Sequence, residues 1–154
     1  LRQRDPYTNW GFWEQATKGL SRQALGPESQ AIGGPGEFSY SVMRRYLRES
    51  RVYLYTGTQP ASYTLGLIEA MMTGIPVVSI GPSWMNVFPY GKLMFEGHEI
   101  ALGYSDDPTI AREMIAGYLE DHSAAMIASD LNRARAIELF GKDPIAAQWK
   151  AFLG

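Results

Sequence analysis

The sequence predicts an α/β fold in which helices cover both faces of a parallel β-sheet. Two short apolar runs, residues 51–56 and 76–80, are separated by good helix formers at 64–73. Parallel strands are buried on both faces and therefore apolar throughout, and a helix usually connects them. A length of 154 residues fits one domain. We therefore expect residues 1–154 to form a single three-layer α/β/α domain.

The first third of the chain is less regular. It predicts a helix over residues 9–18, a short strand near 23–25 and a loop that ends in Gly-Gly-Pro-Gly at 33–36. Residues 37–49 are amphipathic and predict a helix that leads into the first strand. The apolar side of that helix holds Val42, Met43, Tyr46 and Leu47, and its solvated side holds Arg44, Arg45, Arg48 and Glu49.

The central elements carry clear boundary signals. Gly74 follows the helix at 64–73 as a C-terminal cap, and Pro76 prevents its continuation. A short strand is predicted near residues 100–104. Asp107 and Pro108 then supply an N-cap and a first-turn proline for a helix that runs to about Glu120.

Two further helices are predicted at the C-terminal end. One covers residues 123–140 and ends at Gly141, and the other begins at Asp143-Pro144. Their apolar residues recur at helical spacing. We expect the buried side of the last helix to hold Ile145, Trp149, Phe152 and Leu153.

Composition excludes several classes of function. The chain has no cysteine and only two histidines, so disulfide scaffolds, thiol nucleophiles and Cys- or His-rich metal sites are not expected. A net charge of -2 does not favour nucleic-acid binding. No apolar run approaches the ~20 residues that cross a bilayer. We expect a cytoplasmic protein, and peripheral membrane association of a longer enzyme remains open.

The segment between the first strand and its helix is the expected ligand site. In open parallel sheets, ligands bind at the carboxyl ends of the strands. Residues 57–65 lie there, and the N–H groups at the start of the following helix can hold a phosphate. The alternative is that Ser62 or Thr64 only caps that helix.

Glu69 is the most informative side chain in this region. It is the only charged residue between Thr56 and Lys92. A buried carboxylate must be paired or bound, because burying it alone is very costly. Glu69 lies four residues after Leu65 and therefore on the side of the first turn, where it could accept hydrogen bonds from ribose hydroxyls. The alternative is a solvated carboxylate at the rim.

Residues 67–78, LIEAMMTGIPVV, resemble the L-x-E-A-M-x-x-G-x-P-V-V signature of GT-B glycosyltransferases, most closely the family 4-like group. Weaker similarity extends the resemblance over residues 50–153. It implies a Rossmann-like sheet that forms one half of a GT-B fold. This half would bind a nucleoside diphosphate sugar, and the N-terminal acceptor-binding domain would lie outside this chain. The implied reaction transfers a sugar to an acceptor hydroxyl.

The resemblance also implies roles for individual residues. Glu69 would bind the donor ribose, and the segment Ser62, Tyr63, Thr64 and Leu65 would hold the diphosphate through backbone amides. The loop at Gly81 and Pro82 would lie near the donor sugar, and Gly33 and Gly34 near the base. No metal or other cofactor is expected.

The chain departs from the family pattern at Ala61, where the family usually has a first glutamate, and at Thr64, where a glycine is usual. The first departure removes a carboxylate that is often placed at the donor sugar. The alternative is therefore a non-catalytic nucleotide-binding or interaction domain of the same fold.

Overall fold

The computed structural model describes residues 9–25, 27–56, 65–81 and 103–154. It is a mixed α/β structure, mostly helical, with a small open sheet of three parallel strands in the order β1-β2-β3. The strands are β1 (Tyr53–Tyr55), β2 (Val77–Ile80) and β3 (Tyr104–Ser105). Helix α3 (Leu65–Thr73) lies between β1 and β2 in the chain, so the predicted βαβ unit is confirmed.

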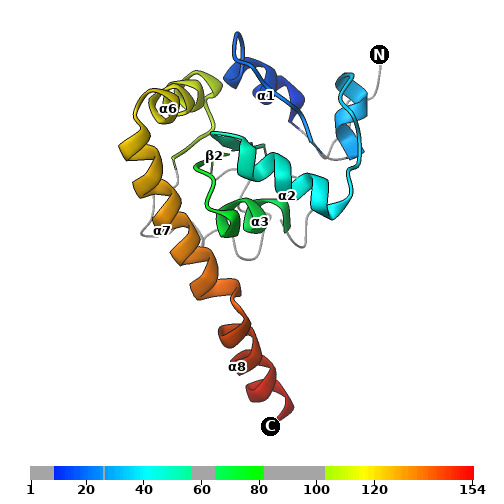
Figure 1. Cartoon of the computed structure of the whole chain (residues 1–154), viewed down its shortest axis with the longest axis vertical. Coiled ribbons are helices and arrows are strands. Elements are labelled where there is room, and N and C mark those ends of the chain that lie inside the picture. The colour runs from blue at the N-terminus through cyan, green and yellow to red at the C-terminus, as the bar shows by residue number, and fades with distance from the viewer. Residues whose placement is uncertain (1–8, 26, 57–64, 82–102) are drawn as a thin grey trace.

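The other described helices precede β1 or follow β3 in the chain (Figure 1). They are α1 (Trp10–Ala16), the 3-10 helix η1 (Pro27–Ile32), α2 (Tyr40–Glu49), α6 (Pro108–Glu120), α7 (His122–Phe140) and α8 (Lys142–Leu153). The predicted helices over residues 9–18, 37–49, 108–120 and 123–140 are confirmed, with small shifts at their ends.

Local chemistry explains where several helices begin and end. The Asn9 side chain accepts a hydrogen bond from the Phe12 N–H at 3.3 Å and so caps α1. Asp107 caps α6 by accepting from the Thr109 N–H at 2.7 Å. Gly74 follows α3 with a φ of 81°, a left-handed conformation that favours glycine and turns the chain into β2.

Two hydrophobic clusters pack on opposite faces of β2. Val77 belongs to a cluster built from α2, α3, β1 and α7. Val78 and Ile80 belong to a second cluster built from α1 and α6. Because successive side chains of a strand point to opposite faces, β2 is covered by helices on both sides. All four of its residues are buried.

One predicted strand is wrong. Residues 23–25 are irregular rather than extended in a sheet. The strand predicted near residues 100–104 is observed as β3 (Tyr104–Ser105), and residues 100–102 lie outside the described residues. The segment 23–25 is too short for its composition to decide pairing, which depends on a neighbouring backbone.

The predicted buried side of the last helix is wrong for its second half, while Ile145 in its first half is half-buried. Trp149 is 60% exposed, Phe152 81% and Leu153 76%. Helix α8 extends beyond the end of α7 and away from the sheet (Figure 1). The apolar side chains in its second half therefore have no part of the described core within reach, although Trp149 and Phe152 contact each other edge to face.

Among the described residues, none of the helices combines the length and the apolar character that crossing a bilayer requires.

Candidate functional site

The carboxyl ends of the strands meet at one edge of the sheet, because all three strands run in the same direction. Helix α3 begins there at Leu65, which is 67% exposed. Gly81 lies at the same edge after β2. Of the predicted site residues, Ser62, Tyr63, Thr64 and Pro82 fall outside the described residues.

Glu69 is half-buried on α3, between the buried residues Ile68 and Ala70. Tyr53 of β1 lies close to it. Burial raises the pKa of the Tyr53 hydroxyl, and the charges of Tyr55 and Glu69 raise that pKa further.

The Tyr53 hydroxyl also lies next to the first turn of α3. It lies 3.5 Å from the point that a Cβ on Gly66 would occupy. Gly66 and Glu69 are three residues apart and so share one face of the helix. The hydroxyl, the exposed helix start and the carboxylate therefore lie together on one side of α3.

The Glu69 carboxylate has no cationic partner in the part of the chain that the structure describes. The ion pair recorded there joins Arg135 to Glu138 on α7. A half-buried carboxylate without a cation retains its capacity to accept hydrogen bonds.

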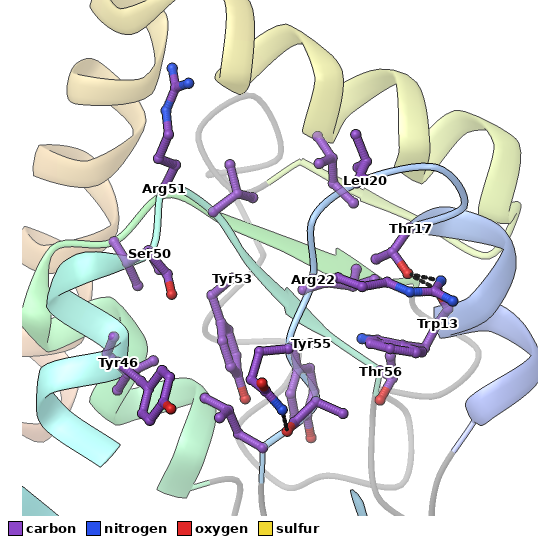
Figure 2. Close-up of a pocket in the computed structure, with 18 of the residues that line it drawn as sticks. Trp13, Thr17, Leu20, Arg22, Tyr46, Ser50, Arg51, Tyr53, Tyr55 and Thr56 are labelled. Atoms are coloured by element: carbon purple, nitrogen blue, oxygen red, sulfur yellow. Dashed lines mark hydrogen bonds between the residues drawn. The ribbon is translucent and has the colours of Figure 1, made fainter. Parts of the chain in front are cut away.

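A cleft of about 910 Å³ runs along β1 (Figure 2). Its floor is residues 51–56, and its opposite wall is residues 20–25 together with α1. At one end it reaches Leu65 and Gly66, the start of α3. Aromatic side chains make up much of its lining: Trp10, Trp13, Tyr46, Tyr53 and Tyr55.

The wall of the cleft carries a fixed cation. The Arg22 guanidinium lies 4.4 Å from the centre of the Trp13 ring (Figure 2). Its Nη1 donates to the Thr17 hydroxyl at 2.6 Å and to the Glu14 carbonyl at 3.1 Å. Stacking and hydrogen bonding together restrict the side chain, so Arg22 presents a positive charge in a defined position.

Close packing against Asp106 explains why position 81 is a glycine. A Cβ there would lie 2.6 Å from Asp106 Oδ1 and 2.7 Å from the Asp106 backbone nitrogen. The chain after β3 therefore comes too close to the end of β2 for any other residue. This contact places Asp106 at the same carboxyl edge as the start of α3.

Gly33 and Gly34 belong to a loop that closes on Ser29. The Gly34 N–H donates to the Ser29 carbonyl at 2.8 Å, and the Gly36 N–H donates to the buried Ser29 hydroxyl at 2.9 Å. The loop follows η1, on the side of α2 away from α6 (Figure 1). Neither glycine lines the cleft.

Within residues 9–25, 27–56, 65–81 and 103–154, no group of three or more His, Cys, Asp or Glu side chains lies together in a way that could hold a metal ion.

The sequence patterns did not indicate two parts of this site. Tyr53 lies in an apolar run that predicts only a strand, and its alternation with Tyr55 is the signal that two hydroxyls share one face of that strand. Trp13 and Arg22 are nine residues apart on either side of a turn, and no sequence spacing predicts that they stack.

No model of a known protein family matches the chain, and no curated protein is similar to it in sequence.

Proposed function

We propose that the chain is the donor-binding domain of a glycosyltransferase with a GT-B fold. It would be a Rossmann-like three-layer α/β/α half of that fold and would bind a nucleoside diphosphate sugar. The full reaction would transfer the sugar to an acceptor hydroxyl. We expect a cytoplasmic location, no nucleic-acid partner and no metal requirement.

One observation carries the proposal. The Glu69 carboxylate is half-buried, has no cationic partner among the described residues, and lies on the same side of α3 as the exposed first turn of that helix. Carboxylates accept strong hydrogen bonds from hydroxyl groups, and ribose offers two adjacent hydroxyls. A diphosphate would lie at the start of α3, where unpaired N–H groups and the helix dipole favour negative charge.

The surroundings agree with an anionic, partly aromatic ligand. The cleft that reaches Leu65 is lined by aromatic rings, and Arg22 adds a fixed positive charge to its wall. Such a cation would stabilise the charge that develops on a departing diphosphate. Because an acceptor domain is not among these residues, we expect weak nucleotide binding and little or no sugar transfer by these 154 residues alone.

Titration with UDP, GDP and ADP, followed by ligand-observed NMR, tests the proposal. We expect one of the three to bind and Glu69→Gln to weaken it about tenfold or more, because a hydrogen bond to a charged group contributes roughly 1.5–3 kcal/mol. Glu113→Gln is the matched control, because it removes the same charge from an exposed position on α6.

A deoxyribose analogue makes the test specific to the ribose contact. The analogue that lacks both ribose hydroxyls should bind wild type and Glu69→Gln with equal affinity, because the interaction partner is absent. Binding of none of the three nucleotides, or an equal loss for both ribose forms, would overturn the proposed role of Glu69.

The second candidate is a non-catalytic nucleotide-binding or interaction domain of the same fold. The alanine at position 61 favours it, because a carboxylate often found at the donor sugar is missing. Sugar transfer by a longer protein that contains this domain separates the two: the second candidate predicts that Glu69→Gln leaves transfer unchanged.

A further inference from the structure

Exposed apolar side chains are concentrated on the two C-terminal helices. Among the described residues, ten large hydrophobic side chains are exposed, and seven of them lie on α7 or α8. Only Gly141 separates the two helices, and together they form an arm that extends away from the sheet (Figure 1). We refer to residues 122–153 as the α7–α8 arm. Apolar side chains gathered in one region of a surface commonly mark a contact with another molecule.

One side of α7 carries an exposed strip of apolar and acidic residues. Its members are Ile127, Asp130, Leu131, Ala134 and Glu138, all of them exposed. At 3.6 residues per turn, this spacing places all five within about 100° of the helix circumference. The residues that α7 buries lie on the opposite side of the helix, so the core does not cover this strip. We refer to it as the α7 strip.

Helix α8 carries a second exposed strip, which we call the α8 strip. Its members are Lys142, Ala146, Trp149, Lys150 and Leu153, all of them exposed. They also fall within about 100° of the helix circumference. Each strip thus holds two large apolar residues, two charged residues and one alanine. The charges are acidic on the α7 strip and basic on the α8 strip.

The apolar residues of the two strips match when the helices are antiparallel. Both helices rise 1.5 Å per residue, so a step forward on one corresponds to an equal step backward on the other. One register therefore places Leu131 level with Trp149 and Ile127 level with Leu153. The same register places the alanines at 134 and 146 level with each other, where small side chains allow a close approach.

This register also brings opposite charges together. Asp130 is level with Lys150, and Glu138 is level with Lys142. Glu138 accepts a hydrogen bond from Arg135 at 2.8 Å, whereas Asp130 and Lys150 have no ion-pair partner in the part of the chain that the structure describes. Complementary charges at facing positions select a partner and fix its register. The α7 strip is therefore complementary to the α8 strip in charge as well as in side-chain size.

A single copy of the chain cannot join its own two strips. Two antiparallel helices need a connecting loop of about two to five residues, and α7 and α8 are separated by Gly141 alone. The Gly141 N–H donates to the Ile137 carbonyl at 2.8 Å, and the Gly141 carbonyl accepts from the Ile145 N–H at 3.2 Å. The backbone thus passes directly from one helix into the next, and the α7 strip can meet an α8 strip only in another copy.

We propose that two copies of the chain form a symmetric dimer through their α7–α8 arms. The arms would lie antiparallel about a two-fold axis near Phe140, so that α7 of each copy packs on α8 of the other. Specific interfaces bury about 800 Å² on each partner, and smaller ones are often transient. Residues 127–153 form a strip of about 40 Å by 10 Å, so we expect a reversible dimer at micromolar concentrations.

Sedimentation velocity of the 154-residue chain across micromolar concentrations tests the proposal. Asp130→Lys should weaken the dimer roughly tenfold or more, because like charges would then face each other at two symmetric positions. Glu113→Lys is the matched control, because it makes the same change of charge at an exposed position on α6. The double variant Asp130→Lys, Lys150→Asp restores opposite charges and should recover most of the wild-type affinity.

An apolar substitution tests the same interface without a change of charge. Trp149→Ser should weaken the dimer roughly thirtyfold or more, because tryptophans at the centre of an interface often dominate its affinity. Ile110→Ser is the matched control, because Ile110 is 44% exposed on α6, outside both strips. The replaced side chains are exposed in the single chain, so far-UV circular dichroism of the monomer should be unchanged in each variant.

Several results would overturn the proposal. The chain could stay monomeric at all concentrations, or its dimer could be unaffected by Asp130→Lys and Trp149→Ser. Failure of the double variant to recover affinity would contradict the antiparallel register. A monomer that binds phosphatidylserine vesicles through Trp149 would identify the arm as a membrane surface instead. No residue of either strip lines the cleft along β1, so these results do not bear on the nucleotide titration.

Discussion

Strands β1 and β2 have similar apolar sequences but different surroundings. β2 lies between two parallel neighbours, and each of its four residues is buried. Among the strands that the structure describes, β1 pairs with β2 alone, and its residues Tyr53 and Leu54 are half-buried. Burial of a strand in this protein is therefore decided by the number of paired neighbours, while an apolar composition is common to both strands.

The largest expected effect comes from shortening one apolar side chain in each strand to alanine and comparing the two losses in the free energy of unfolding. Ile80→Ala should lower the free energy of unfolding by about 3 kcal/mol, because the side chain is fully buried. Leu54→Ala should cost only about 1 kcal/mol, because its half-buried side chain borders the cleft along β1. Urea denaturation measures both values, and equal costs would show that β1 is as enclosed as β2.

A pH series examines the face of β1 that packs on α3. Tyr53 has a pKa raised above its ordinary value of 10.0, so the folded state keeps the proton while the unfolded state loses it. Stability should be unaffected by this group below pH 10 and should fall above it, by about 1.4 kcal/mol per pH unit. Urea denaturation from pH 9 to 11 measures the slope.

Tyr53→Phe should make that fall shallower, since phenylalanine does not ionise. Tyr40→Phe is the matched control, because this tyrosine is 64% exposed. A residual slope is expected from Tyr118, whose pKa is also raised by burial. Identical slopes in wild type and Tyr53→Phe would mean that Tyr53 is hydrated in the folded protein.

The contrast between paired and unpaired groups recurs on α7. The buried Ser129 hydroxyl donates to the Gly74 carbonyl, whereas neither side-chain atom of the buried Asn132 has a hydrogen-bond partner. Removing an unsatisfied polar group of similar shape is favourable, so Asn132→Leu should stabilise the protein by about 1 kcal/mol. Ser129→Ala should destabilise it by a similar amount. Thermal unfolding reports both signs, and destabilisation by Asn132→Leu would contradict the first.

The smallest effect is expected on α8. Phe152 is 81% exposed, so Phe152→Ser should change the free energy of unfolding by less than about 0.5 kcal/mol. The same denaturation assay measures it. A loss of 2 kcal/mol or more would restore the sequence-based prediction that this side of the helix is buried.

The sequence predicted those features that depend on neighbouring residues. Asn9 and Asp107 cap helices through hydrogen bonds to residues two or three positions later, and Gly74 takes the left-handed conformation that its position after α3 requires. Such interactions lie within one turn of the chain, and short patterns record them.

Features that depend on distant segments were not predictable in this way. Residues 23–25 have a strand-like composition but no paired neighbour, and Trp149 has an apolar helix position but no core to cover it. For the candidate site, the sequence indicated Glu69 and the start of α3. It did not indicate Tyr53 or the Trp13–Arg22 stack, because both depend on how α1 and β1 approach in space.

Gly74 has a further consequence for how the segment at 67–78 is interpreted. The Gly74 carbonyl accepts a hydrogen bond from the Ser129 hydroxyl. A Cβ on Gly74 would lie 3.3 Å from the Ser129 hydroxyl oxygen. Packing thus accounts for Gly74 and for the buried residues Val77 and Val78, whereas it does not account for the half-buried Glu69. Unrelated proteins that need the same helix-to-strand corner could converge on most of these letters, so the acidic position alone distinguishes shared chemistry from shared geometry.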